Sequence, residues 1–165
     1  MDLTSLLSHY PFSPEVTESA QVIKGMVGSQ ASIVGASQFL EADNDFVFIL
    51  NDKEEAAYFL NDLEKLIGSK RVFFFPGSYR RPYQMEETDN ANVLLRAEVL
   101  NRLNSRRQSA AIVTYPEALF ERVVTKKTLS ANTLRLANGE RIDIDFLNET
   151  LFEYRFERTD FVTEP

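Results

Sequence analysis

Residues 46–75 read FVFILNDKEEAAYFLNDLEKLIGSKRVFFF, and this stretch decides the fold. It begins and ends with continuous apolar runs of strand length, and AAIVTY at residues 110–115 is a third such run. Runs of this kind are typical of strands buried on both faces of a parallel sheet. Between the first two runs, Asp52 and Glu55 resemble the capping box of a helix that stops at Gly68. The alternation of strand and helix predicts an α/β domain.

Further helices are expected around these elements. Asp89 can cap a helix before the third apolar run, Ser29 precedes another helix, and Ser13-Pro14-Glu15 is a typical helix start. In these three helices the residues expected to face the core are, in turn, Val93, Ala97, Leu100 and Leu103; Ile33, Ala36 and Leu40; and Val16 and Ala20. Val22–Lys24 is a candidate short strand. Residues 1–128 are therefore predicted to form a three-layer α/β domain, with helices on both faces of a parallel sheet.

The sequence pattern changes near Thr128. The expected elements are a strand at Thr133–Ala137, a turn at Asn138-Gly139, a return strand at Arg141–Ile144, a helix capped by Asp145, and a strand at Thr159–Thr163. The helix would carry the apolar residues Phe146, Leu147, Leu151 and Phe152. Because the chain stops directly after a predicted strand, residues 129–165 are interpreted as the beginning of a second, truncated α+β domain.

The charge and composition exclude several classes of site. The chain has 165 residues, with 18 Lys and Arg against 25 Asp and Glu, so its formal net charge is −7. That balance disfavours strong nonspecific DNA binding, which needs clustered basic residues. There is no Cys, and His9 is the single His, so we expect no metal centre. The N-terminus lacks the features of a signal peptide, and no stretch approaches the roughly 20 apolar residues of a membrane span, so a cytoplasmic location is expected.

Residues 25–32, GMVGSQAS, lie where a phosphate-binding loop would be found, between a candidate strand and a predicted helix. The functional pattern is GxxxxGK[ST], in which backbone N–H groups and the Lys bind phosphates and the hydroxyl holds Mg²⁺. Gln30 replaces the second glycine and Ala31 replaces the Lys. The positions of this degenerate loop are Gly25, Gly28, Ser29, Gln30, Ala31 and Ser32. The segment is either a degenerate nucleotide loop or an ordinary strand–helix turn, and the residues alone favour the turn.

A second candidate site combines basic and aromatic residues. Tyr79, Arg80, Arg81 and Tyr83 lie in a predicted long loop after Pro76, and Lys70 and Arg71 lie at the start of the predicted strand before it, Arg71–Phe75. Such side chains can contact a nucleic-acid backbone or a carboxylate-rich partner. A solvated surface is an equally good interpretation, given the acidic chain.

The order and spacing of these segments resemble the N-terminal region of the bacterial transcription-repair coupling factors (Mfd), which is itself similar to the excision-repair helicase subunit UvrB. The resemblance covers nearly the whole chain after about Ser13. The segments that carry it are GMVGSQAS, FVFILND, LEKLIGSKRVFFFPGS, LLRAEVLNRL, AAIVTYPEALFERV and TLRLANGERIDIDFLNETLFEYRFERTDFVTEP.

The resemblance implies a UvrB-like fold that has lost its phosphate loop, with no cofactor in this part of the protein. In the family, ATP and Mg²⁺ serve a motor further along the chain. The implied function is a non-catalytic module of an ATP-dependent DNA translocase, with helicase and ATP hydrolase motifs elsewhere, that displaces stalled RNA polymerase and recruits UvrA for nucleotide excision repair. The family's UvrA-contacting arginine falls after Pro165. UvrB-like chains also carry a long DNA-probing hairpin where this chain has only a short connection, Gly77 to Leu95, so that hairpin is expected to be missing.

Two other interpretations of the residues stay open. The chain could be an autonomous nucleotide-binding enzyme of the P-loop type, although the missing Lys argues against it. It could also be a small-molecule-binding α/β domain, whose site would be formed by the loops after Leu50, Phe75 and Tyr115 at the carboxyl ends of the strands.

Overall fold

The computed structural model describes residues 22–42, 44–81, 84–105, 108–134, 136–154 and 156. The elements are α2 (Gln30–Glu41), β1 (Phe46–Ile49), α3 (Lys53–Ile67), the 3₁₀ turn η1 (Ser69–Arg71), β2 (Val72–Phe75), β3 (Tyr79–Arg81), β4 (Gln84–Thr88), α4 (Asn90–Ser105), β5 (Ala111–Thr114), α5 (Pro116–Phe120), α6 (Lys126–Ala131) and α7 (Ile144–Glu153). The chain divides into two compact units after Leu129. No helix in the described ranges could cross a membrane. His9, the predicted first helix and the predicted strand Thr159–Thr163 lie outside the described residues.

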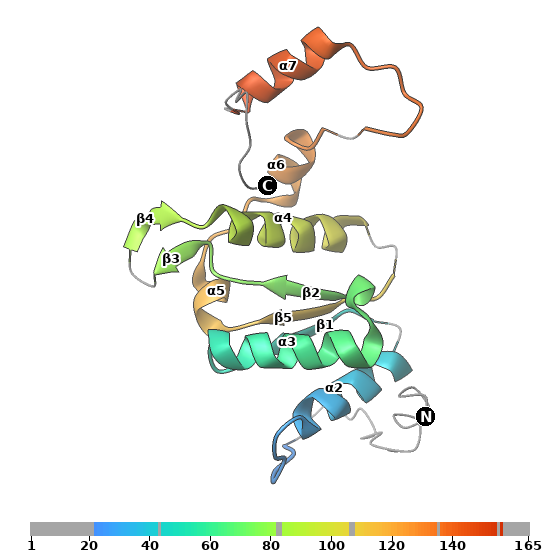
Figure 1. Ribbon diagram of the computed structural model, residues 1–165, viewed down its shortest axis with the longest axis vertical. Helices are drawn as coiled ribbons and strands as arrows, with labels where there is room; N and C mark the ends of the chain where they lie inside the picture. The colour runs from blue at the N-terminus through green and yellow to red at the C-terminus, as the bar shows by residue number, and fades with distance from the viewer. Residues whose placement is uncertain are drawn as a thin grey trace. The chain divides into compact units, whose positions relative to one another are not determined.

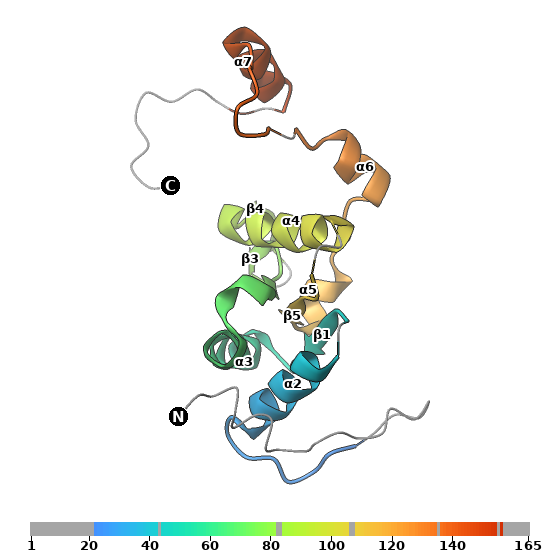
Figure 2. The ribbon, with the colours of Figure 1, turned by 90° about the vertical axis from the view of Figure 1, so that its right-hand side faces the viewer.

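The first unit is built on a three-stranded parallel sheet with the strand order β1-β5-β2. Phe46 of β1 and Val72 of β2 both lie opposite Ala111 of the central strand, so the three strands begin level with one another. Helices α2 and α3 cover one face of the sheet and α4 the other, as Figures 1 and 2 show. The α/β class, the three layers and all three strands predicted from apolar runs are confirmed, with strand ends within one residue of those expected.

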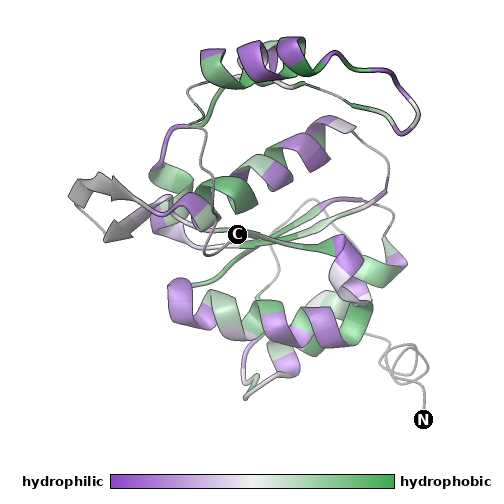
Figure 3. Cartoon of the chain, turned by 45° about the horizontal axis from the view of Figure 1, so that its top comes forward, coloured by the Kyte–Doolittle hydropathy of each residue, from purple (hydrophilic) through white to green (hydrophobic). Residues whose placement is uncertain are grey.

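The core lies between the sheet and its helices, where Figure 3 shows apolar residues along the strands. All four residues of β5 are buried, as expected for a central strand. Strand β1 differs, because Val47 and Ile49 are 55% and 58% exposed. The prediction that this strand is buried on both faces is wrong. Phe46 and Phe48 pack under α2 and α3, where the ring centres of Phe48 and Phe59 lie 5.0 Å apart. On the opposite face of the sheet, α4 contacts mainly β2 and leaves β1 open.

Two predicted helix caps are confirmed. The Asp52 carboxylate accepts a hydrogen bond from Glu55 N at 2.8 Å, at the start of α3. Glu55 in turn accepts one from the side-chain nitrogen of Asn51 at 2.8 Å. Asp89 accepts one from Ala91 N at 3.0 Å, at the start of α4. A local pattern was sufficient here because a cap is made by residues within three positions of one another.

The predicted core-facing stripe of α4 is correct only in part, because Leu100 packs against the core as expected but the stripe does not lie at the centre of the buried face. Val93 and Leu103 are 43% and 41% exposed, whereas Arg96 and Val99 are buried. The helix is rotated because Arg96 and Asn92 reach polar groups at the end of the sheet, as described below. On α2, Leu40 is likewise 37% exposed, although Ala36 is buried as predicted.

Two further predictions in the first unit need correction. Val22–Lys24 is not a strand, because the six residues 22–27 have no regular secondary structure. The connection from Gly77 to Leu95 is not a simple loop, because it contains the antiparallel hairpin β3–β4 and the first turns of α4. Residues of high β propensity are few in this hairpin, which left it without a sequence signal.

The second unit contains the predicted helix but neither of the two predicted strands that can be examined. Residues 133–134, 136–137 and 140–143 have no strand structure, and Ile144 begins α7. The N-cap is Asp143, whose carboxylate accepts from Asp145 N at 2.9 Å, so the predicted cap at Asp145 is wrong by two residues. The turn at Asn138-Gly139 does form, with Gly139 at φ 92°. In the described part of this unit no residue is buried, and Phe146 and Phe152 are 53% and 63% exposed.

Candidate functional site

The turn at residues 76–78, where β2 ends and β3 begins, is held by side chains from distant parts of the chain. Gly77 N donates to the Tyr115 hydroxyl at 2.8 Å, and the Gly77 carbonyl accepts from Asn92 Nδ2 at 2.9 Å. A Cβ at this position would lie 2.9 Å from Glu121 Oε1 and 3.3 Å from the Tyr115 hydroxyl. A residue with a Cβ would therefore push the Glu121 carboxylate and the Tyr115 hydroxyl away from the backbone.

Ser78, the next residue of the turn, is bonded even more completely. Its N–H donates to both carboxylate oxygens of Glu121, at 2.8 and 2.9 Å, and its hydroxyl donates to Oε2. Its carbonyl accepts from Asp89 N at 2.8 Å, which joins the two ends of the β3–β4 hairpin. All backbone hydrogen-bonding groups of Gly77 and Ser78 thus have a partner, although the turn belongs to no helix or sheet.

Arg96 completes the group from inside the protein. Its Nη1 donates to the Pro76 carbonyl at 2.6 Å and to the Ala118 carbonyl at 3.0 Å. The same nitrogen lies 3.7 Å from Glu121 Oε2, and the guanidinium carbon lies 4.1 Å from the centre of the Phe75 ring. The two charged side chains are only 7% and 16% exposed. We refer to Asn92, Arg96, Tyr115 and Glu121 as the clamp.

Burial sets the acid–base behaviour of the clamp. Loss of hydration lowers the pKa of Arg96 from its usual value, and the negative charge of Glu121 acts in the opposite direction. Burial also raises the pKa of Tyr115, more than the hydrogen bond from Gly77 N lowers it. Arginine is not deprotonated in proteins, so at neutral pH the clamp contains a buried cation and a neutral phenol beside the Glu121 side chain. Arg96 Nη2 is buried and has no hydrogen-bond partner among the described residues.

The clamp lies at the carboxyl end of the parallel strands, next to the predicted basic and aromatic residues. Tyr79, Arg80 and Arg81 form β3, which follows the turn directly, and Tyr79 is half-buried. Tyr83 lies outside the described residues. Whether these four residues bind a ligand stays a prediction.

Lys70 and Arg71 do not join this group. They lie in η1, at the start of β2, whereas the β3–β4 hairpin follows the end of β2. The two groups are therefore at opposite ends of this strand (Figure 1). Arg71 has a packing role, with its Nη2 2.5 Å from Ser109 Oγ and its guanidinium 4.5 Å from the centre of the Phe39 ring.

In the segment predicted as a degenerate phosphate loop, two glycines have positive φ and one backbone donor is bonded to a side chain of the same segment. Gly25 and Gly28 have φ values of 81° and 57°, a conformation that favours glycine. Gln30 Oε1 accepts from Val27 N at 2.8 Å, so a side-chain amide occupies a backbone donor that a phosphate could otherwise use. Ser29 is the N-cap residue of α2 but makes no side-chain cap.

The next two positions of this loop are turned toward the protein interior. Ser32 is 3% exposed, and its hydroxyl donates to Asp62 Oδ2 of α3 at 3.1 Å. Ala31, at the position of the missing Lys, is half-buried and packs against the core. The hydroxyl that would hold Mg²⁺ in a functional loop is therefore used to join two helices.

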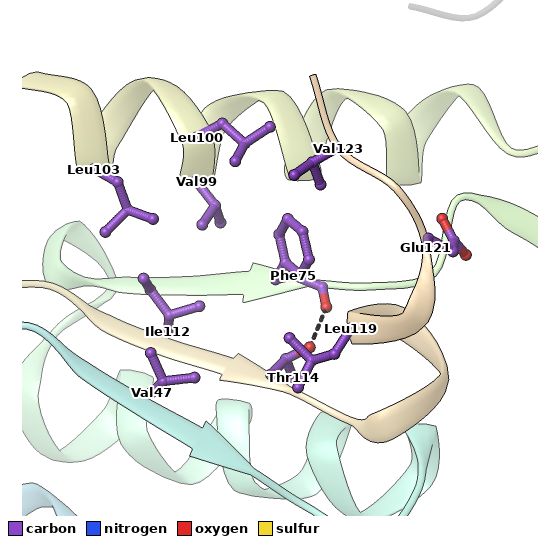
Figure 4. A pocket seen from close by; sticks show the side chains of 10 residues that line it. All are labelled: Val47, Phe75, Val99, Leu100, Leu103, Ile112, Thr114, Leu119, Glu121 and Val123. Carbon is purple, nitrogen blue, oxygen red and sulfur yellow. Dashed lines mark hydrogen bonds between the residues drawn. The ribbon is translucent and has the colours of Figure 1, made fainter. Parts of the chain in front are cut away.

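An apolar pocket of about 240 Å³ lies on the α4 face of the sheet. Figure 4 shows Val99, Leu100 and Leu103 of α4 above it and Val47 and Ile112 of the sheet below. The remaining lining residues are Phe75, Thr114, Leu119, Glu121 and Val123. The Thr114 hydroxyl donates to the Phe75 carbonyl at 2.8 Å and Glu121 belongs to the clamp, so the polar lining groups are already bonded. Small-molecule sites usually present several convergent polar groups, which this pocket does not offer.

The described residues contain no cluster of three or more His, Asp or Glu side chains that could hold a metal ion. Sequence reasoning missed the clamp, because its four members are scattered from Asn92 to Glu121 and meet only in the fold. One signal was available. Arg96 lies three residues after Val93 and three before Val99, in the middle of a helix that must bury one face.

Comparison with known proteins gives two significant matches. The transcription-repair-coupling factor of Rickettsia typhi is 25% identical over 116 residues, which are 70% of this chain and 10% of that protein. The factor of the same name from Rickettsia bellii is 25% identical over 115 residues, 69% of this chain and 10% of that protein. The chain thus spans about a tenth of the length of the relatives it matches. No protein-family model and no solved structure matches it. The chain is similar to a segment of transcription-repair coupling factors.

Proposed function

We propose that this chain forms a non-catalytic, UvrB-like module of a transcription-repair coupling factor. The observation that carries the proposal is the similarity, over 70% of the chain, to a protein of that name. The parallel α/β core and the glycine turn before α2 support it, because both suit a domain derived from a phosphate-loop fold. In this proposal the ATP-dependent motor lies elsewhere in a longer protein.

The module would act without nucleotide. Two groups that a phosphate loop needs are missing, since Ala31 supplies no cation and the Ser32 hydroxyl is bonded to Asp62. The Gln30 side chain further occupies Val27 N. The module would instead serve as a scaffold, through which the parent protein brings together DNA, RNA polymerase and the damage-recognition protein UvrA. In this proposal UvrA recruitment is a role of the second unit.

A chimera tests the proposal. The chain would replace the matching segment of the R. typhi factor, and ATP-dependent displacement of a stalled RNA polymerase and UvrA recruitment would be measured. We expect the chimera to retain both activities. The matched control is the same chimera with Val113→Asp, which places a charge in the fully buried centre of β5 and should abolish folding of the module. A well-folded chimera that displaces polymerase but never recruits UvrA would contradict the scaffold role.

Calorimetry with MgATP tests the nucleotide-free part of the proposal. We expect no binding heat for the chain alone. The variant Ala31→Lys should not restore binding, because the loop would still lack a free hydroxyl and its second glycine. Micromolar affinity of the unmodified chain would instead favour the nucleotide-binding alternative.

A further inference from the structure

We propose that Asn138 is a site of spontaneous deamidation, at which its side chain forms a succinimide with the Gly139 nitrogen and then opens to isoaspartate and aspartate. Asn138 is the only asparagine of the chain that is followed by glycine. The pair belongs to the second unit and takes no part in the parallel sheet or in the clamp. The inference is therefore independent of the proposed function.

The pair lies in an open turn. Both residues are exposed, and they form the middle of a four-residue turn from Ala137 to Glu140. Glu140 N donates to the Ala137 carbonyl at 3.2 Å, and Glu140 Oε2 accepts from Ala137 N at 3.1 Å. A Cβ built on Gly139 would meet no atom within 4 Å. Apart from its two chain neighbours, no described residue therefore crowds Gly139 at that position.

The Gly139 nitrogen is the nucleophile of the reaction. The structure shows no hydrogen bond from this N–H to any other described residue. Gly139 has a φ of 92°, the positive value that favours glycine at the third position of a turn. Because glycine has no Cβ, its nitrogen can approach the Asn138 side chain with little steric hindrance. An asparagine inside a helix differs, since the N–H of the next residue donates to a carbonyl of the preceding turn.

The reaction needs only water, and it makes asparagine one of the thermolabile residues of proteins. The Gly139 nitrogen gives its proton to the solvent and attacks Cγ of Asn138, so that a C–N bond forms and closes a five-membered ring. The Cγ–Nδ2 bond then breaks, and the amide nitrogen takes up a proton and leaves as ammonia. Water opens the resulting succinimide at either carbonyl, which gives aspartate or isoaspartate. No electron is transferred, and the net change is the exchange of ammonia for water.

Both products change the turn. A carboxylate replaces the neutral amide of Asn138, which adds a negative charge close in sequence to the exposed Glu140. In isoaspartate the main chain also runs through Cβ and Cγ, so it is one carbon longer between Ala137 and Glu140. The closing hydrogen bond from Glu140 N to the Ala137 carbonyl then no longer fits. Deamidation should therefore loosen the segment that leads to Asp143, the N-cap of α7.

The experiment incubates the intact chain at mildly alkaline pH and follows each asparagine by mass spectrometry of tryptic peptides. Asn138 falls in the peptide 136–141, and the matched control, Asn148, falls in the peptide 142–155. Asn148 is also exposed, but the next residue, Glu149, has a Cβ and lies within α7. We expect Asn138 to deamidate at least about tenfold faster than Asn148, a difference of about 1.4 kcal/mol in activation free energy.

Two variants test the assignment to this pair. Gly139→Ala should slow the reaction at residue 138, because its Cβ hinders the approach of the nitrogen. Asn138→Gln retains an amide but would have to close a six-membered ring, so its deamidation at this residue should be lost. A methyltransferase specific for isoaspartate should label the aged unmodified chain at residue 138 and leave this position unlabelled in Asn138→Gln. The aged unmodified chain should also bind more strongly to an anion-exchange column, because it has gained negative charge.

Two results would overturn the inference. If Asn138 deamidates no faster than Asn148, the pair is not a reactive site. A synthetic peptide of residues 136–141 supplies the rate without the fold. If the intact chain reacts more than about tenfold slower than this peptide, the turn protects Asn138 and the inference is wrong. Similar rates in the chain and the peptide would support it, because they would show that the turn leaves the Gly139 nitrogen free to react.

Discussion

Replacing Arg96 by Leu should be among the most damaging single changes in the first unit. Leu retains much of the apolar stem that packs near Phe75 but removes both hydrogen bonds from Nη1. The carbonyls of Pro76 and Ala118 lose their donor, and the Glu121 carboxylate, only 16% exposed, loses its countercharge. An uncompensated charge and two unpaired carbonyls would then remain in a nearly dry site.

Removing one partner of a buried ion pair typically costs about 3–5 kcal/mol of folding free energy, mainly because the other charge stays buried. For a urea m-value of about 2 kcal/mol/M, the unfolding midpoint would fall by roughly 1.5–2.5 M. Arg102→Leu is the matched control on the same helix. Arg102 lies 5.8 Å from the centre of the Phe73 ring and donates to the exposed Gln108 carbonyl, so its loss should cost less than about 1 kcal/mol.

Urea titration followed by circular dichroism measures both variants. The double variant Arg96→Leu with Glu121→Gln should be less destabilised than the sum of the single variants, because the second change removes the unpaired charge. A loss below about 1 kcal/mol for Arg96→Leu would refute the reasoning, since it would mean that water already hydrates the pair. Strict additivity of the two changes would refute the coupling between them.

Three other predictions concern stability. Gly35→Ala should lower the melting temperature, because the new Cβ would lie 2.8 Å from the Phe48 ring. Such overpacking costs about 1–3 kcal/mol, which exceeds the stabilisation expected from the higher helix propensity of Ala. Asp52→Ala should cost about 1 kcal/mol in a urea titration by removing the cap on Glu55 N, whereas Asp52→Ser should retain most of the stability. Burial raises the pKa of Tyr115 above its unfolded value of about 10, so the contribution of its neutral hydroxyl to folding stability is complete below that pH and is lost as pH rises through the folded pKa. Unfolding midpoints measured on either side of about pH 10 should show this decline in the unmodified chain and lack it in Tyr115→Phe.

The sequence alone determined the features that depend on neighbouring residues. Apolar runs identified all three strands of the parallel sheet, and burial under helices on both faces explains the run for β5, whose four residues are all buried. Asp52 and Asp89 identified the starts of α3 and α4, because a cap acts within one helical turn. The glycine turn of the degenerate phosphate loop was likewise visible in the sequence, and so was the absence of its Lys.

Only the tertiary structure decided the features that depend on which segments meet. The apolar pattern of β1 could not show that α4 leaves Val47 exposed, because the position of a covering helix is set by the whole sheet. The clamp could not be read from the chain, since Arg96 and Glu121 are distant in sequence and their charges are tolerated in the interior only because they meet there. In the folded protein this arginine fixes the end of the sheet, through its hydrogen bonds to the Pro76 and Ala118 carbonyls.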